Sequence, residues 1–254
     1  MMTSFFISVC KDSLFNLFIL YKIIYNFAKN IPLPLSQNFI NNVRIPENND
    51  WVIFILLGCV FLFIFMMNII ERDANLRDFL LQKYFDASNN LPSWVITSCV
   101  TVLTLSILIS QYIPVVPKYI ADLQILGFQA NKFGYTLMAV TLFYLAKSTF
   151  GFLFYQSIGD GKKWLIFYFT STKFYFVLSF LLIILCITQY YFPVDRNKMF
   201  LYYLYFFGFV FIFKIFFYLF HKNKILPEKW YYKFLYICTL QIAPLLLLWK
   251  LLFF

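Results

Sequence analysis

The sequence predicts an all-α protein, a polytopic membrane helix bundle with six transmembrane helices and additional interfacial amphipathic helices. Of the 254 residues, 62% are hydrophobic and 13% are charged, whereas soluble domains are about 45–50% apolar and about 25% charged. Apolar stretches recur along the chain at about the 20 residues that a helix needs to cross a bilayer. The Lys and Arg residues, which give a net charge of +10, lie mostly between these stretches, where membrane loops carry positive charge.

Residues 1–50 are predicted to form a region of their own, ahead of a transmembrane domain at 51–254. Residues 5–27 are mostly apolar, but charged and amide side chains interrupt them on one helical face. This pattern favours an amphipathic helix in the membrane interface, and an extra transmembrane helix is the alternative. Residues 31–50 are rich in Pro and Asn and are predicted to be a polar connector.

The first span is predicted at 51–70, and its first residue, Trp51, is of a type that anchors helices at the interface. Residues 71–90 mix charges with apolar residues at helical spacing, which predicts a helix on the membrane surface. A docking site for a cytoplasmic partner is the alternative. The second span is predicted at 94–113, where small hydroxyl residues favour close helix packing, a solute path being the alternative. Its polar stripe is Thr97, Thr101, Thr104 and Gln111.

The third span is predicted at 137–157, after a long loop at 114–135. A basic turn follows at 158–163, because Gly and Asp residues there favour a turn. Residues 164–169 are apolar but too short to cross a bilayer, and we expect them in the interface.

The fourth span, 174–192, ends at Pro193, and the short turn after it makes the fifth span, 199–220, an antiparallel neighbour. The fifth span is dense in Phe and Tyr. Lys214 lies near its end, where a long side chain can reach the headgroups. The last span is predicted at 233–254.

Basic residues also orient the bundle. Loops 71–93, 158–173 and 221–233 fall on one side and carry about twice as many Lys and Arg as the opposite gaps, so they are predicted to be cytoplasmic. The C-terminus then lies outside. The last loop holds the densest basic cluster, which sets topology, and binding of anionic lipid headgroups is the alternative. This cluster is His221, Lys222, Lys224, Lys229 and Lys233.

Lys147 at the centre of the third span is the most informative residue. It lies roughly 15 Å from either end of its helix, too deep to reach the headgroups easily. A charge at that depth costs on the order of 3 kcal/mol, so Lys147 should face the bundle interior and be paired. Holding helices together, transport or proton relay, and catalysis are its three candidate roles. Its candidate partners are Thr104, Tyr144, Gln241 and the Leu240 carbonyl, which Pro244 leaves without a hydrogen bond.

Catalytic and metal sites are not predicted. No Asp or Glu lies inside the six spans, and the one histidine, His221, lies in a loop. The five cysteines have no metal-ligand spacing, so we expect no metal and no cofactor. Ser148 adjoins Lys147, but adjacent helical residues do not face each other, which argues against a Ser–Lys dyad. Nucleic-acid binding is not expected, because the basic residues lie in the loops.

Several features together resemble a known family. Asn49, Asp50 and Trp51 open a span that a charged segment follows, and the lysine-centred span carries Gly151 and Phe152. The closing helix contains the run YICTLQIAPLLLLWK, and is the strongest point of similarity. These features resemble an uncharacterised family of multi-pass inner-membrane proteins of diderm bacteria, domain of unknown function 4271, over roughly residues 50–252.

The resemblance implies a location and a topology but no reaction, because that family has no established activity. Its pattern often has Glu where this chain has Gln241. The resemblance therefore implies a Lys147–Gln241 hydrogen bond here in place of a Lys–Glu pair, which argues against a proton-coupled role.

The function hypothesis that fits these observations best is a non-catalytic subunit or scaffold of a bacterial envelope membrane complex. Its partners would be the lipid bilayer and other membrane-protein subunits. A small-solute or ion transporter that uses the buried lysine is the first alternative. An intramembrane enzyme is the second.

Overall fold

The computed structural model describes the transmembrane domain and leaves residues 1–49 outside the described set. The predictions of an interfacial helix, an extra span or a connector at 1–50 therefore remain predictions. The described residues are 50–71, 76–82, 84, 90–113, 124–125, 128–129, 132–192, 196–220, 225–227 and 229–253.

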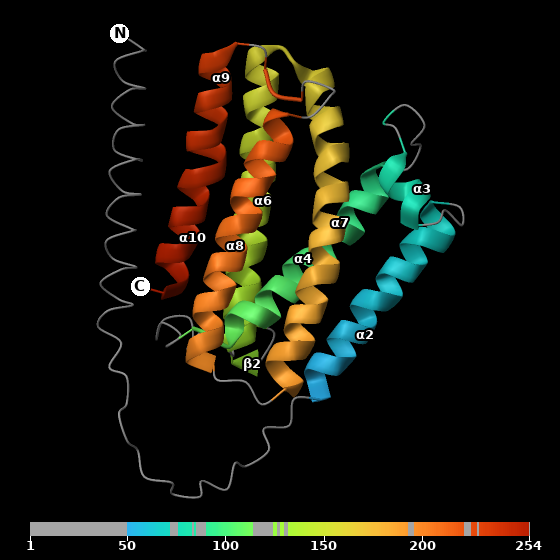
Figure 1. Ribbon diagram of the computed structural model, residues 1–254, viewed down its shortest axis with the longest axis vertical. Helices are drawn as coiled ribbons and strands as arrows, with labels where there is room; N and C mark the ends of the chain where they lie inside the picture. The colour runs from blue at the N-terminus through green and yellow to red at the C-terminus, as the bar shows by residue number, and fades with distance from the viewer. Residues whose placement is uncertain are drawn as a thin grey trace, which may run out of the picture.

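Helices dominate this part of the chain (Figure 1). Six of the helices in the described ranges are long and apolar enough to cross a membrane, which confirms the predicted fold class. In chain order the elements are α2 (Asp50–Phe65), the π-helix η1 (Met66–Ile70), α3 (Leu76–Leu81), α4 (Asn90–Ser110), β1 (Gln124–Ile125), β2 (Phe128–Gln129), α6 (Lys132–Ile158), α7 (Gly161–Tyr191), α8 (Arg196–Leu219), α9 (Trp230–Leu235), the π-helix η3 (Tyr236–Ile242) and α10 (Ala243–Phe253).

Helix α4 is the centre of the bundle. It crosses the other helices obliquely and packs mainly against α7 and α6, with α2 on its outer side (Figure 1). The continuous helix formed by α9, η3 and α10 closes the opposite edge and packs against α6. The two short strands pair antiparallel, with Ile125 opposite Phe128; the sequence did not predict them.

Small hydroxyl residues explain why α4 is central, because they let neighbouring helices approach closely and hydrogen-bond across the contact. The Thr101 and Ser179 hydroxyls lie 2.7 Å apart and join α4 to α7. The Ser98 hydroxyl donates to the Tyr144 hydroxyl at 2.8 Å and joins α4 to α6. Thr97 is fully buried in the same stripe. Of the predicted stripe, Thr101 therefore joins α4 to a neighbouring helix, which agrees with the packing role.

Helix α7 corrects one prediction. We expected residues 164–169 to lie separately in the interface, ahead of a span beginning at 174. Instead a single helix runs over 31 residues, Gly161–Tyr191. No Gly or Pro occurs at positions 162–191 to interrupt the helical hydrogen bonds.

The turn that joins α6 to α7 was predicted from its Gly and Asp residues. Gly159 has φ +81°, a left-handed conformation that glycine adopts without steric cost. The Gly159 N–H donates to the Gln156 carbonyl and the Asp160 N–H to the Tyr155 carbonyl, each at 3.1 Å. These bonds satisfy carbonyls at the end of α6. The tight turn makes α6 and α7 antiparallel neighbours.

The structure describes only part of the surface helix predicted at 71–90. Within it, the residues Leu76–Leu81 form α3, which buries Phe79 and leaves its other side chains exposed. Lys173 of α7 donates to the Leu80 carbonyl at 3.2 Å. Since a cation near a helix C-terminus interacts favourably with the last carbonyls, Lys173 ties α3 to the bundle.

Candidate functional site

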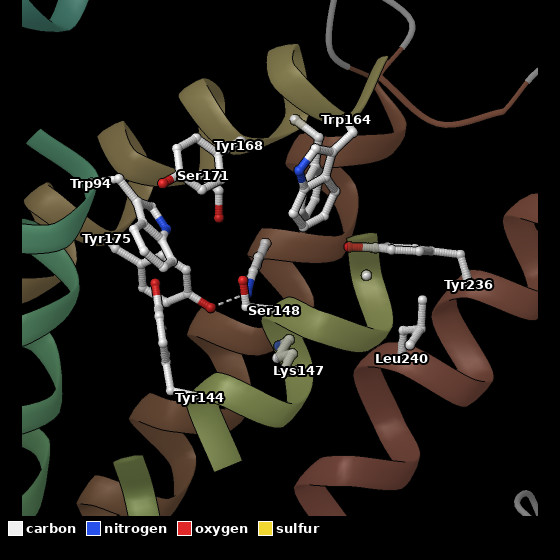
Figure 2. Close-up of a pocket in the computed structure, with 13 residues that line it drawn as sticks. Trp94, Tyr144, Lys147, Ser148, Trp164, Tyr168, Ser171, Tyr175, Tyr236 and Leu240 are labelled. Carbon is white, nitrogen blue, oxygen red and sulfur yellow. Dashed lines mark hydrogen bonds between the residues drawn. The ribbon is translucent and has the colours of Figure 1, made fainter. Parts of the chain in front are cut away.

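A cavity opens between α4, α6, α7, α8 and η3, and Figure 2 shows the side chains around it. Its volume is about 40 Å³, which holds about three water molecules at on the order of 10–15 Å³ each. The cavity lies toward the end of the bundle where α6 ends and α7 begins. Aromatic side chains form most of its wall: Trp94, Tyr144, Trp164, Phe167, Tyr168, Tyr175 and Tyr236.

Lys147 lines this cavity and makes one of the contacts expected from the sequence. Its Nζ donates to Oε1 of Gln241 at 2.9 Å. The Gln241 side chain is buried, and its Nε2 donates to the Tyr236 hydroxyl at 2.7 Å. Gln241 is thus held at both ends, which fixes its carbonyl oxygen toward Lys147. The chain links α6 to η3 through three polar side chains.

The π-helix η3 positions Gln241. Pro244 has no N–H for the helical hydrogen bond, and it was predicted to bend the last helix. The structure shows a π-helical turn before Pro244, in which the Ala243 N–H donates to the Cys238 carbonyl five residues back. Such π-turns are rare and frequently occur at functional sites. Pro244 itself does not line the cavity.

Lys214 of α8 is the functional candidate that sequence reasoning missed. We expected its side chain to reach the headgroups, but it is only 7% exposed and lines the same cavity as Lys147. Its Nζ donates to the Tyr175 hydroxyl at 2.6 Å and lies 4.6 Å from the centre of that ring. The ring of Tyr218 lies 5.6 Å away. The faces of aromatic rings attract a cation, so the Lys214 side chain can be stabilised inside the bundle as well as at the headgroups.

Lys147 of α6 and Lys214 of α8 line the same cavity, so the structure brings their two amines to one place. Among the described residues that line the cavity there is no Asp or Glu. Each lysine donates one hydrogen bond there, and the acceptors, an amide and a phenol, are neutral. The cavity therefore brings two amines together without a carboxylate to neutralise them.

The other predicted polar residues divide between the cavity and the packing. Ser148 and Tyr144 lie on the cavity wall, and the Tyr144 hydroxyl accepts the bond from Ser98. Thr104 does not line the cavity; its hydroxyl donates to the Val100 carbonyl of its own helix at 2.8 Å. The structure thus joins Lys147 to Gln241 and separates it from Thr104.

The predicted basic cluster is only partly described. Lys229 is exposed and Lys233 is half-buried. His221, Lys222 and Lys224 lie outside the described residues. In the described part of the chain, no group of His, Cys, Asp and Glu side chains has the arrangement of a metal site.

Comparison with known proteins places this architecture in a family. A family model described as a domain of unknown function, DUF4271, matches residues 51–252. The chain belongs to the DUF4271 family. No curated protein and no solved structure matches the chain. The DUF4271 match includes every residue that lines the cavity and nearly all of the six candidate spans, so the resemblance to this family is confirmed.

Proposed function

We propose that the protein is a small-solute transporter of the inner membrane, with its binding site at the Lys147 cavity. The observation that carries this proposal is that Lys147 lines an open cavity instead of a closed helix contact. A lysine that only held helices together would need no adjoining space. Intramembrane ionisable residues that face a cavity commonly mark solute paths.

The wall of the cavity includes a π-helix, η3, and irregular helices of this kind can change conformation during transport. Tyr236 and Leu240 belong to η3, whose hydrogen bonds follow the π pattern. Interrupted helices near the middle of the membrane commonly form the sites of transporters. Because η3 carries Gln241, a shift of this helix would change the contact with Lys147.

We also propose the orientation predicted from the charges, with loops 71–93, 158–173 and 221–233 in the cytoplasm of a diderm bacterium. The cavity then lies nearer the cytoplasmic side. Single cysteines placed at 162 and at 195 in a cysteine-free variant should react with a membrane-impermeant maleimide from opposite sides. Labelling of both positions in intact cells would contradict this topology.

Transport is tested in proteoliposomes by light scattering, with a panel of acetate, phosphate, glycerol and choline. We expect at least one of these solutes to enter faster than into empty liposomes, and Lys147→Met to remove that difference. Lys250→Met is the matched control, since Lys250 is exposed on α10. The proposal of transport through this site is wrong if no solute enters faster than into empty liposomes, or if Lys147→Met and Lys250→Met show the same rate of entry.

A second candidate, a subunit of an envelope membrane complex, is favoured by one surface of α8. Phe209, Phe213, Phe216 and Phe220 are all more than half exposed. The rings of Phe216 and Phe220 stack at 6.2 Å with an angle of 7° between their planes. This ordered ridge would suit another transmembrane helix. A photo-crosslinker at position 213 should then capture one specific membrane protein, whereas the same probe at exposed position 57 of α2 should not.

A further inference from the structure

The charges around the cavity indicate what kind of ligand it takes. Lys147 and Lys214 both line it, and neither has an acidic partner among the described residues. Gln241 and Tyr175 accept hydrogen bonds from the two amines but supply no negative charge. Two cations in a poorly solvated space repel each other, and an anion placed between them would attract both.

The hydrogen-bonding capacity indicates the same kind of ligand. An ammonium group has three N–H donors, of which Lys147 gives one to Gln241 and Lys214 gives one to Tyr175. Ser148 adds a hydroxyl on the same wall. The site therefore offers amine donors together with hydroxyl groups that can also donate, an arrangement that suits the oxygen atoms of an oxyanion.

The size of the cavity limits the ligand further. About 40 Å³ is room for a group of a few heavy atoms. A carboxylate or a phosphate group has this size. The rings of Trp164 and Tyr168 on the wall leave the remainder of a small organic acid an apolar surface to contact.

We infer that the pocket binds a small oxyanion, a carboxylate or a phosphate, through the ammonium groups of Lys147 and Lys214 on its wall. This inference rests on the proposed solute-binding role of the cavity and adds the chemical class of the solute. Lys214 is the second binding residue. A soluble anion fits the small volume better than a lipid headgroup, whose phosphate has the same chemistry.

The first experiment measures binding to the purified full chain in nanodiscs of zwitterionic lipid by calorimetric titration with sodium acetate and sodium phosphate. Removal of one charged hydrogen-bond donor should weaken binding about tenfold or more, so we expect this loss in both Lys147→Met and Lys214→Met. Lys250→Met should bind as the native protein does. Glycerol and choline chloride, as neutral and cationic probes, should not bind.

The second experiment uses the neutral partner of Lys147. Gln241→Glu keeps the shape of the side chain and the contact at Lys147 but places a carboxylate inside the site. This fixed carboxylate should compete with the ligand and weaken acetate binding about tenfold or more. Gln156→Glu, on the exposed part of α6, is the matched control and should leave binding unchanged. Thermal unfolding checks that each variant is folded.

The results separate this inference from the transport proposal. Oxyanion binding that depends on both lysines, without entry into liposomes, supports the site and contradicts transport. Entry of glycerol or choline that depends on Lys147, without oxyanion binding, supports transport and overturns the inference. Unchanged oxyanion affinity in both lysine variants also overturns it. If phosphatidylglycerol in the nanodiscs competes with acetate through both lysines, the oxyanion is a lipid phosphate.

Discussion

The indole ring of Trp164 lies directly against Gly151, where α6 and α7 pass each other beside the two-lysine cavity. A Cβ atom at position 151 would lie 2.9 Å from Cζ3 and 3.2 Å from Cη2 of this ring. Phe167 stacks on the same indole with ring centres 5.5 Å apart, and Tyr155 packs at 5.7 Å. The missing side chain at Gly151 therefore sets how far Trp164 enters the wall of the cavity.

Gly151→Ala should destabilise the protein, because the rigid indole must move among packed aromatic neighbours. Overpacking of this kind typically costs about 1–3 kcal/mol. Gly58→Ala on α2 is the matched control, since nothing lies within 4 Å of its added methyl group, and alanine favours a helix by about 0.5–1 kcal/mol over glycine. Thermal unfolding in mild detergent compares the two variants. Equal effects would show that Trp164 does not constrain Gly151.

Lys214→Met should stabilise the anion-free protein even though it removes a binding residue. The substitution takes away one of two adjacent cations and leaves an apolar side chain of similar length among aromatic rings. Replacement of buried charges by apolar groups often stabilises a protein by about 1–4 kcal/mol, and loss of the Tyr175 bond offsets part of this. Unfolding is measured at low salt without oxyanion buffers, beside Lys250→Met. An earlier unfolding of Lys214→Met would contradict the repulsion argument.

The Thr101–Ser179 bond between α4 and α7 should contribute measurably to the contact. Thr101→Val, Ser179→Ala and the double variant form a cycle, for which we expect a coupling of about 0.6 kcal/mol, the average for hydrogen bonds between membrane helices. The reference is Thr149→Val, because the Thr149 hydroxyl is exposed and bonds only to the Leu145 carbonyl of its own helix. Unfolding in mixed micelles supplies the free energies. Additive effects of the two single variants would mean that this bond adds nothing.

Lys173→Met should release α3 from the bundle. Lys173 donates to the carbonyls of Leu80 and Gln82 at the end of that helix and lies 4.3 Å from the centre of the Phe169 ring. Faster hydrogen exchange at residues 76–82, with unchanged exchange in α4, is the expected result. Lys163→Met is the control, since Lys163 makes only an i,i+3 pair with Asp160 near the surface. Unchanged exchange in Lys173→Met would show that Phe79 alone holds α3.

Local features of the chain predicted much of the fold. Length and hydropathy mark each span, because a membrane helix must satisfy its own backbone hydrogen bonds and present apolar side chains to lipid. Gly159 likewise predicted the turn between α6 and α7, because a left-handed backbone conformation strongly favours glycine. The predicted start of the fourth span at residue 174 does not match the start of α7 at Gly161. Apolar side chains mark the part of a helix that contacts lipid, but they do not mark the residue at which the helix begins. At 162–173 the helix continues past the apolar core, and no sequence signal separates the two parts.

By itself, the sequence determined the helical fold class, the order of the six candidate spans and the position of Lys147 near the middle of the third. The tertiary structure alone decided that Lys214 turns inward, that Thr104 does not contact Lys147, and that Lys147 and Lys214 line one cavity. The physical reason is rotation about the helix axis. A helix such as α8 is apolar on nearly every side, so its hydrophobic pattern does not show which side faces lipid and which faces protein. The fit of side chains between neighbouring helices determines which side faces the bundle interior.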